Sequence, residues 1–159
     1  MKKSFNKKLA VWGILSVLLL CVIYGQSLLS RTESKEITGV AVEQLKPSLD
    51  PDNTMRKDDF HHIVRKVGHV GIYALLGFFF GRFTYFLGKS RGSRYISMPL
   101  LAALMVAVSD EYVQSLVGRS SLVTDVILDF LGVLLGFGTA CLWAYLCYRR
   151  ELKHENGLQ

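Results

Sequence analysis

The chain has 159 residues, half of which are hydrophobic, and its mean hydropathy is positive at +0.29. A soluble domain of this size is less apolar, so the composition excludes an ordinary soluble protein and predicts an integral membrane protein. The formal net charge of +6 does not indicate nucleic-acid binding, because the basic residues lie at the ends of apolar segments and form no stripe with interleaved aromatics.

Four apolar segments succeed one another along the chain. Each reaches about 20 residues, the helix length that crosses a hydrocarbon core of about 30 Å. We therefore predict an all-α membrane protein that forms one domain, residues 1–159. Its fold is a compact bundle of four transmembrane helices at about residues 9–29, 67–87, 95–117 and 123–148.

The first apolar segment comes after four lysines, as a cleaved signal peptide would. We favour a retained transmembrane helix, because the apolar run exceeds the roughly 7–15 residues of a signal peptide and no A-x-A-like cleavage site comes after it.

The connection between the first two spans, about residues 30–66, is predicted to be an extracytoplasmic loop. Its first part is polar with one short apolar patch, which we expect to lie on the membrane as an amphipathic helix. Pro47 and Pro51 predict a break after it. Asp58 or Asp59 is expected to cap the N-terminus of a helix that runs into the second span.

The distribution of lysine and arginine predicts the orientation. Both terminal tails and the link between the second and third spans are rich in these residues, whereas residues 30–66 contain seven basic and seven acidic residues. Because positive residues favour the cytoplasmic side, we expect both termini inside, and the 30–66 loop and the turn at Arg119 outside.

Polar residues lie on one face of each of the last three spans. In the second span, Lys66, His69 and Tyr73 share a face, and Gly77 and Gly81 further along allow a close helix neighbour. The third span carries Asp110, Glu111 and Gln114. The fourth carries Asp125, Asp129, Gly132 and Gly136 at helical spacing.

These faces are predicted to converge beneath the outer leaflet, with His69 within about 6 Å of a carboxylate. A carboxylate at mid-bilayer costs roughly 2.5–3.5 kcal/mol, so such residues usually mark a site. Too few cations face the acids to keep all of them ionised, so at least one acid should have a raised pKa and stay protonated. Carboxyl groups with different pKa values are suited to general acid–base catalysis. The candidate catalytic residues are Asp110, Glu111, Asp125, Asp129 and His69, and the candidate substrate-binding residues are Lys66, Tyr73, Gln114 and Arg119. The alternative is a structural network in which the acids pair with Lys66 or Arg119.

A metal site is a separate hypothesis. His61, His62 and His69, together with nearby carboxylates, have the right chemistry for zinc or a harder cation. Their spacing matches no closed-site pattern, so we expect solvated loop histidines, no metal and no cofactor.

Two stretches resemble the motifs of VanZ-like bacterial membrane proteins. The first is Arg65-Lys66-x-x-His69-x-x-x-Tyr73-x-x-Leu76-Gly77. The second runs from Ser109-Asp110-Glu111-x-x-Gln114 through Gly118-Arg119-Ser120 to Asp125-x-x-x-Asp129-x-x-Gly132-x-x-x-Gly136. The resemblance covers roughly residues 9–148. The chain departs from the pattern at Ile72, where many relatives have glutamate, and at Val117, where many have proline.

The resemblance implies a multi-pass protein of the bacterial cytoplasmic membrane that affects resistance to teicoplanin-type glycopeptide antibiotics. Three functions stay open. The first is binding of a membrane lipid or lipid-linked glycan of the cell envelope. A glycopeptide antibiotic or an envelope protein is a further possible partner, and we expect no binding of nucleic acid. The second is an intramembrane hydrolase or transferase acting on a lipid-linked or cell-envelope saccharide. The third is a small oligomeric transporter, although four unbroken spans without inverted repeats disfavour it.

Overall fold

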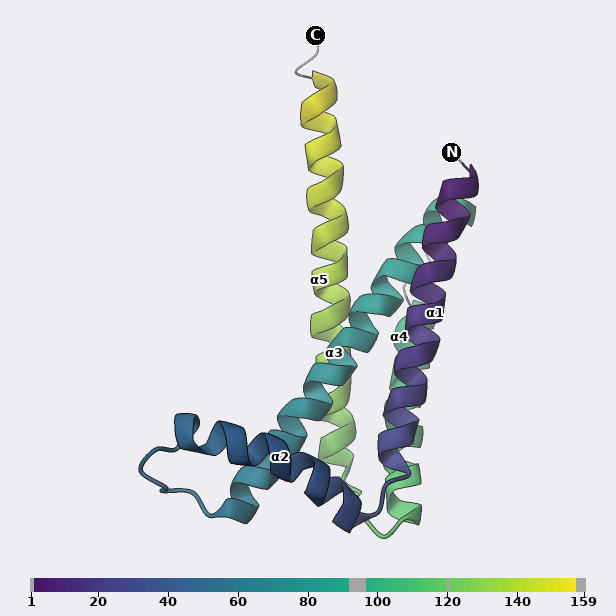
Figure 1. Ribbon diagram of the computed structural model, residues 1–159. Helices are drawn as coiled ribbons and strands as arrows, with labels where there is room; N and C mark the ends of the chain where they lie inside the picture. The colour runs from purple at the N-terminus through teal and green to yellow at the C-terminus, as the bar shows by residue number, and fades with distance from the viewer. Residues whose placement is uncertain (1, 92–96, 120, 157–159) are drawn as a thin grey trace.

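The computed structural model describes residues 2–91, 97–119 and 121–156, and within these ranges all regular structure is helical. The helices in chain order are α1 (Lys2–Ser27), α2 (Arg31–Leu49), α3 (Lys57–Arg91), α4 (Ser97–Leu116) and α5 (Val123–Asn156), shown in Figure 1.

Three of these helices are long and apolar enough to cross a membrane: α1 over Lys7–Ser27, α3 over Lys57–Gly88 and α5 over Val123–Arg150. The remaining expected span coincides with α4, a helix of 20 residues. Asp110, Glu111 and Gln114 all fall in its second half. These polar residues interrupt its apolar stretch, which explains why α4 is not among the three helices that qualify by composition.

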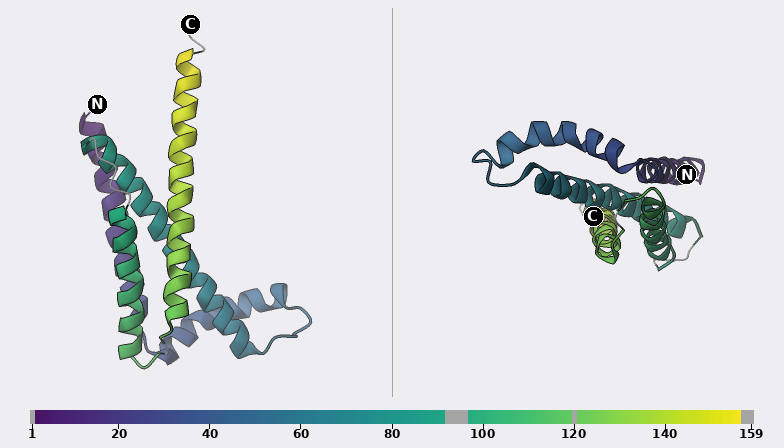
Figure 2. Two further views of the ribbon diagram at one scale, coloured as in Figure 1. Left: turned by 180° about the vertical axis from the view of Figure 1, so that it is seen from behind. Right: turned by 90° about the horizontal axis from the view of Figure 1, so that it is seen from below.

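The helices are arranged around α3, which packs against α1, α2, α4 and α5. α3 runs obliquely and crosses α5, while α1 and α4 lie side by side (Figures 1 and 2). α2 lies across the molecule at the end where α4 turns into α5. Both chain termini lie at the opposite end.

Glycines let α3 and α5 approach closely where they cross, as their spacing predicted. A methyl group on Gly132 would stand 2.5 Å from the carbonyl oxygen of Val70, and one on Gly136 would overlap the carbonyl oxygen of Ala74. From the other side, a methyl group on Gly77 would overlap the backbone of Val133. The two backbones are therefore in direct contact at this crossing.

Arg82 joins three helices away from the carboxylates, 13 residues and about 20 Å along α3 from His69. Its guanidinium carbon lies 5.1–5.6 Å from four aromatic ring centroids, those of Trp12, Tyr85, Phe86 and Trp143. Cation–π attraction of this kind is strongest away from water, so it ties α1 and α5 to α3 at this end.

α2 begins with a capping box, in which Ser30 and Glu33 exchange hydrogen bonds with each other's backbone N–H. The apolar patch expected to lie on the membrane is divided: Val42 is fully buried, whereas Val40 is 62% exposed. The break expected between the two parts of this connection is confirmed, because α2 ends at Leu49 and α3 begins only at Lys57. Pro47 itself lies inside α2, and the helix continues past it to Leu49.

Asp50 organises the turn from α2 to α3. Its carboxylate accepts hydrogen bonds from the backbone N–H groups of Thr54 and Met55 and from the Lys46 ammonium. The hydrogen bond from Lys46 and those from Thr54 hold the pKa of Asp50 well below its usual range. α3 then starts at Lys57, so Asp58 and Asp59 occupy its first turn, and the expectation that one of them is the N-cap was wrong.

Candidate functional site

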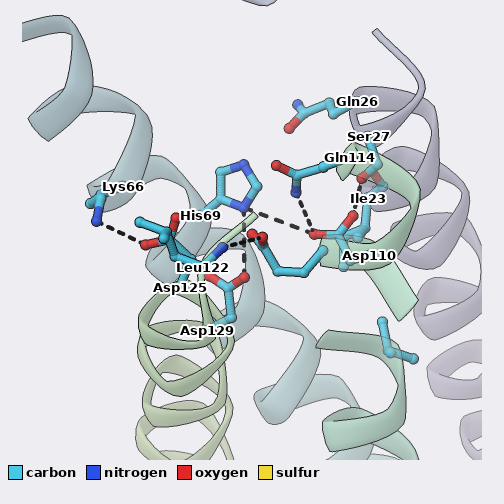
Figure 3. Close-up of polar contacts among 12 residues, drawn as sticks. Ile23, Gln26, Ser27, Lys66, His69, Asp110, Gln114, Leu122, Asp125 and Asp129 are labelled. Carbon is cyan, nitrogen blue, oxygen red and sulfur yellow. Dashed lines mark hydrogen bonds and ion pairs between the residues drawn. The ribbon is translucent and has the colours of Figure 1, made fainter. Parts of the chain in front are cut away.

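His69 of α3, Asp110 of α4 and Asp129 of α5 meet at one point in the bundle (Figure 3). The Nδ1 atom of His69 lies 3.7 Å from a carboxylate oxygen of Asp129 and 4.0 Å from one of Asp110. Both aspartates are buried, and the histidine side chain is 22% exposed. The convergence expected from the helical faces is therefore confirmed, at distances shorter than the expected limit.

Asp110 is the most connected of the three residues. Ser27 of α1 donates a hydrogen bond to its Oδ1, and Gln114 of α4 donates one of 3.0 Å to its Oδ2. The hydroxyls of Tyr24, one turn before Ser27 on α1, and of Ser109, next to Asp110 on α4, lie 2.5 Å apart and join the same two helices. Polar contacts therefore tie α1 to α4 at two successive turns, and those of Ser27 and Gln114 fix the Asp110 carboxylate in place.

Ser27 and Tyr24 were not among the residues singled out as site candidates. The signal was present but weak: they are polar residues at the end of an otherwise apolar segment. A helical serine can also donate to the carbonyl four residues earlier, and the Ser27 hydroxyl lies 2.8 Å from that of Ile23. Only the position of α1 against α4 reveals the contact with Asp110.

Asp129 and Tyr73 carry buried oxygens without hydrogen-bond partners. Asp129 is 1% exposed, and its Oδ2 has no partner within hydrogen-bonding distance among the described residues. The hydroxyl of Tyr73, one turn after His69 on α3, is buried and also lacks a partner there. A buried polar atom without a partner costs about 1–3 kcal/mol, so the site is polar beyond what its own side chains satisfy.

Lys66 forms an ion pair with Asp125 at 2.8 Å, on the more exposed side of the cluster. This pair agrees, for Lys66, with the alternative in which the acids form a structural network, and it lies at the rim of the cluster. Glu111 is buried and accepts a hydrogen bond of 3.3 Å from the backbone N–H of Leu122 at the start of α5. Among the described residues, no lysine or arginine lies within 4.0 Å of the carboxylates of Asp110, Glu111 or Asp129.

Arg119 was expected to face the carboxylates, but no carboxylate among the described residues lies within 4.0 Å of it. It is 6% exposed, one of its guanidinium nitrogens donates to the carbonyl of Gln26 at 3.2 Å, and its Nε has no partner in the described part of the chain. Burial and the nearby charge of Arg65 lower the pKa of Arg119, and the smaller opposing effect of the Asp110 and Glu111 charges shows that these carboxylates still act on it beyond 4.0 Å. Two guanidinium groups therefore lie near each other, and at least one has a spare donor.

Two pockets meet at this cluster and share Arg65 and His69. The smaller, of about 20 Å³, is also lined by Lys66, Glu111, Gln114, Leu128 and the carboxylates of Asp125 and Asp129. The larger, of about 240 Å³, is a groove between α1, α2 and α3. Arg65 and Arg119 bring positive charge to it, and most of its remaining lining is apolar: Leu29, Ile37, Ala41, Val64, Gly68 and Ile72. The groove suits an amphiphile with a negative head group, and the small pocket suits proton transfer or a single small ligand.

A sequence model of the family described as VanZ/LLP1 matches residues 12–144 of the chain. This match includes every residue of the two pockets. No curated protein and no solved structure matches the chain.

Proposed function

The chain belongs to the VanZ/LLP1 family, and from this premise we propose a function for it. It is a bacterial cytoplasmic-membrane protein with four transmembrane helices that binds an anionic envelope lipid or lipid-linked glycan at the outer leaflet. By binding this lipid, the protein modulates susceptibility to teicoplanin-type glycopeptides.

The proposed orientation has both termini in the cytoplasm, and α2 and the Arg119 turn outside. Two observations support four spans with both termini on the same side of the membrane, and the lysine and arginine distribution assigns that side to the cytoplasm. Both termini lie at one end of the molecule and α2 at the other (Figure 1). The 20 residues of α4 are about 30 Å long, enough to cross the hydrocarbon core as a fourth span.

Cysteine labelling tests this orientation, in a chain whose Cys21, Cys141 and Cys147 are replaced by serine. An impermeant maleimide added to intact cells is expected to label Ser48→Cys in α2 and to leave Ser90→Cys, near the end of α3, unlabelled. Disrupting the membrane should make the second site reactive. Labelling of Ser90→Cys in intact cells would reverse the orientation.

The observation that carries the lipid proposal is the pair of arginines in the apolar groove. Arg65 and Arg119 line it together, and no carboxylate among the described residues lies within 4.0 Å of either. Arginine donors match phosphate oxygens bidentately, and like charges held together bind an anion more strongly than either would alone. The apolar lining beside them is suited to the lipid chain.

An intramembrane acid–base enzyme is the second candidate. The observation that favours it is the contact of His69 with two buried carboxylates beside a pocket that adjoins the groove. Histidine exchanges protons near neutral pH, so this cluster could act on the head group of a lipid held by the arginines.

Native mass spectrometry in detergent tests lipid binding, with a polyprenyl diphosphate as the ligand and the corresponding prenol as the neutral control. Arg65→Gln and Arg119→Gln are each expected to weaken diphosphate binding about tenfold or more, since a charge-assisted hydrogen bond contributes roughly 1.5–3 kcal/mol. Arg56→Gln, an exposed arginine outside the groove, is the matched control and should bind as wild type. Equal binding of prenol and diphosphate, or unchanged binding in both groove variants, would contradict the proposal.

A further inference from the structure

We propose that His69, Asp110 and Asp129 form a binding site for one divalent transition-metal ion. The site lies at the junction of α3, α4 and α5, and it does not depend on lipid binding. The metal site considered from sequence combined His69 and nearby carboxylates with the histidines His61 and His62, and the site proposed here uses neither of those two.

The geometry is close to that of a metal site with three protein ligands. One ligand atom from each residue lies within 4.8 Å of the other two. His69 Nδ1 lies 3.7 and 4.0 Å from its two carboxylate partners. Ligands bonded to zinc at about 2.0–2.1 Å in a tetrahedron lie about 3.4 Å apart, so small side-chain movements would close the site. Three different helices supply these side chains, so the fold itself brings the ligands together.

Hydrogen bonds fix the Asp110 carboxylate in position, as is usual for carboxylates that bind metal ions. Both of its oxygens accept hydrogen bonds, from Ser27 on α1 and Gln114 on α4. Such outer contacts orient a ligand before the ion arrives and reduce the ordering needed on binding. They leave each oxygen a second lone pair for an ion.

Asp129 provides the independent indication that the site takes a ligand. It is 1% exposed, its Oδ2 faces His69, and that oxygen accepts no hydrogen bond from the described residues. Lys66 lines the same pocket, but it forms its ion pair with Asp125, at 2.8 Å, and not with Asp129. A buried carboxylate pair without lysine or arginine needs a positive charge or a proton, and a divalent ion ligated by His69 would supply the charge.

The small pocket gives the ion an open side. It is lined by His69 and Asp129 together with Glu111 and Gln114, and its volume of about 20 Å³ has room for roughly one water molecule. A metal with three protein ligands keeps a position for water or a substrate oxygen, which this pocket would hold. One imidazole with two carboxylates suits Zn²⁺ or Mn²⁺, because imidazole is a common zinc ligand and carboxylates are common ligands of Mn²⁺.

Metal binding is measured directly on purified protein in nanodiscs without added lipid ligand. After EDTA treatment, the wild-type chain is expected to take up one equivalent of Zn²⁺ or Mn²⁺ in calorimetric titration, and its melting temperature should rise with added ion. Asp129→Asn and His69→Gln should each weaken binding about tenfold or more, because losing a direct ligand costs at least as much as losing an outer partner.

The matched control is the double variant Lys66→Met with Asp125→Asn. It removes a carboxylate from the same pocket without changing the pocket's net charge, and it should bind the ion as wild type does. Three results would overturn the proposal: no stoichiometric binding to the wild-type chain, unchanged affinity in both ligand variants, or an equal loss in the control. If a ligand variant does not fold, the wild-type titration and the control decide the question. Failure of diphosphate binding with intact metal binding would reject only the lipid proposal.

Discussion

Replacing Gly136 with leucine is expected to remove most of the protein from the membrane. A Cβ at this position would overlap the carbonyl oxygen of Ala74 and crowd the backbone N–H of Phe78. Because backbone atoms cannot move aside as a side chain can, α5 would have to separate from α3. Overpacking alone costs typically 1–3 kcal/mol, and a clash with backbone costs more.

Gly138 offers a matched control on the same helix. It lies two residues further along α5, and a methyl group there would meet nothing within 4 Å among the described residues. Gly138→Leu should therefore accumulate and migrate in detergent chromatography as wild type does. Immunoblotting of membranes for both variants checks the prediction, and equal abundance of the two would mean that α3 and α5 do not cross in backbone contact.

The closely packing faces of α3 and α5 were predictable from sequence because glycine spacing is local and periodic, whereas the pairing of these two helices with each other was not predicted. Gly77 and Gly81 on one helix, and Gly132 and Gly136 on the other, are each four residues apart, so each pair must lie on one face. The acidic residues share that periodicity, and His69 could be expected near them. Features that depend on the face of a single helix could therefore be predicted.

The partners of each charge were not predictable, because they depend on how the helices are rotated and tilted. Lys66 could reach any of several acids on the neighbouring helices, and only the oblique course of α3 selects Asp125. Arg119 lies in a turn whose direction no periodicity determines, and it points towards Gln26 on α1. Ser27 becomes a site residue only through the α1–α4 contact.

The connection between α1 and α3 illustrates a second limit. Pro47 normally argues for a helix end, yet α2 continues two residues past it and ends at Leu49. Asp58 and Asp59 both have the chemistry of an N-cap, but Asp50 closes the preceding turn and lets α3 begin at Lys57. Local preferences identified the right residues here and missed the boundaries by a few positions.

The two aspartates of α5 should respond differently to neutralisation. Asp129→Asn is expected to leave membrane abundance unchanged and to abolish the effect on teicoplanin susceptibility that we propose for the protein. Among the described residues, the cationic group within 4.0 Å of Asp129 is His69 at 3.7 Å, which can release its proton, so no charge is left stranded. Asparagine keeps the shape of the side chain but can neither exchange a proton nor neutralise a cation.

Asp125→Asn should instead lower abundance, because it leaves the ammonium of Lys66 without its partner at 2.8 Å. The loss should be modest, about 1 kcal/mol or less, since Lys66 is 41% exposed and water can solvate it. Adding Lys66→Met removes the unpaired charge and should restore abundance.

The measurement is the inhibitory concentration of teicoplanin per molecule of membrane protein in cells expressing each variant. If Asp129→Asn keeps its full effect on teicoplanin susceptibility, the role of the buried acids is structural. If its abundance falls by as much as its effect does, the carboxylate is needed for folding and not for chemistry.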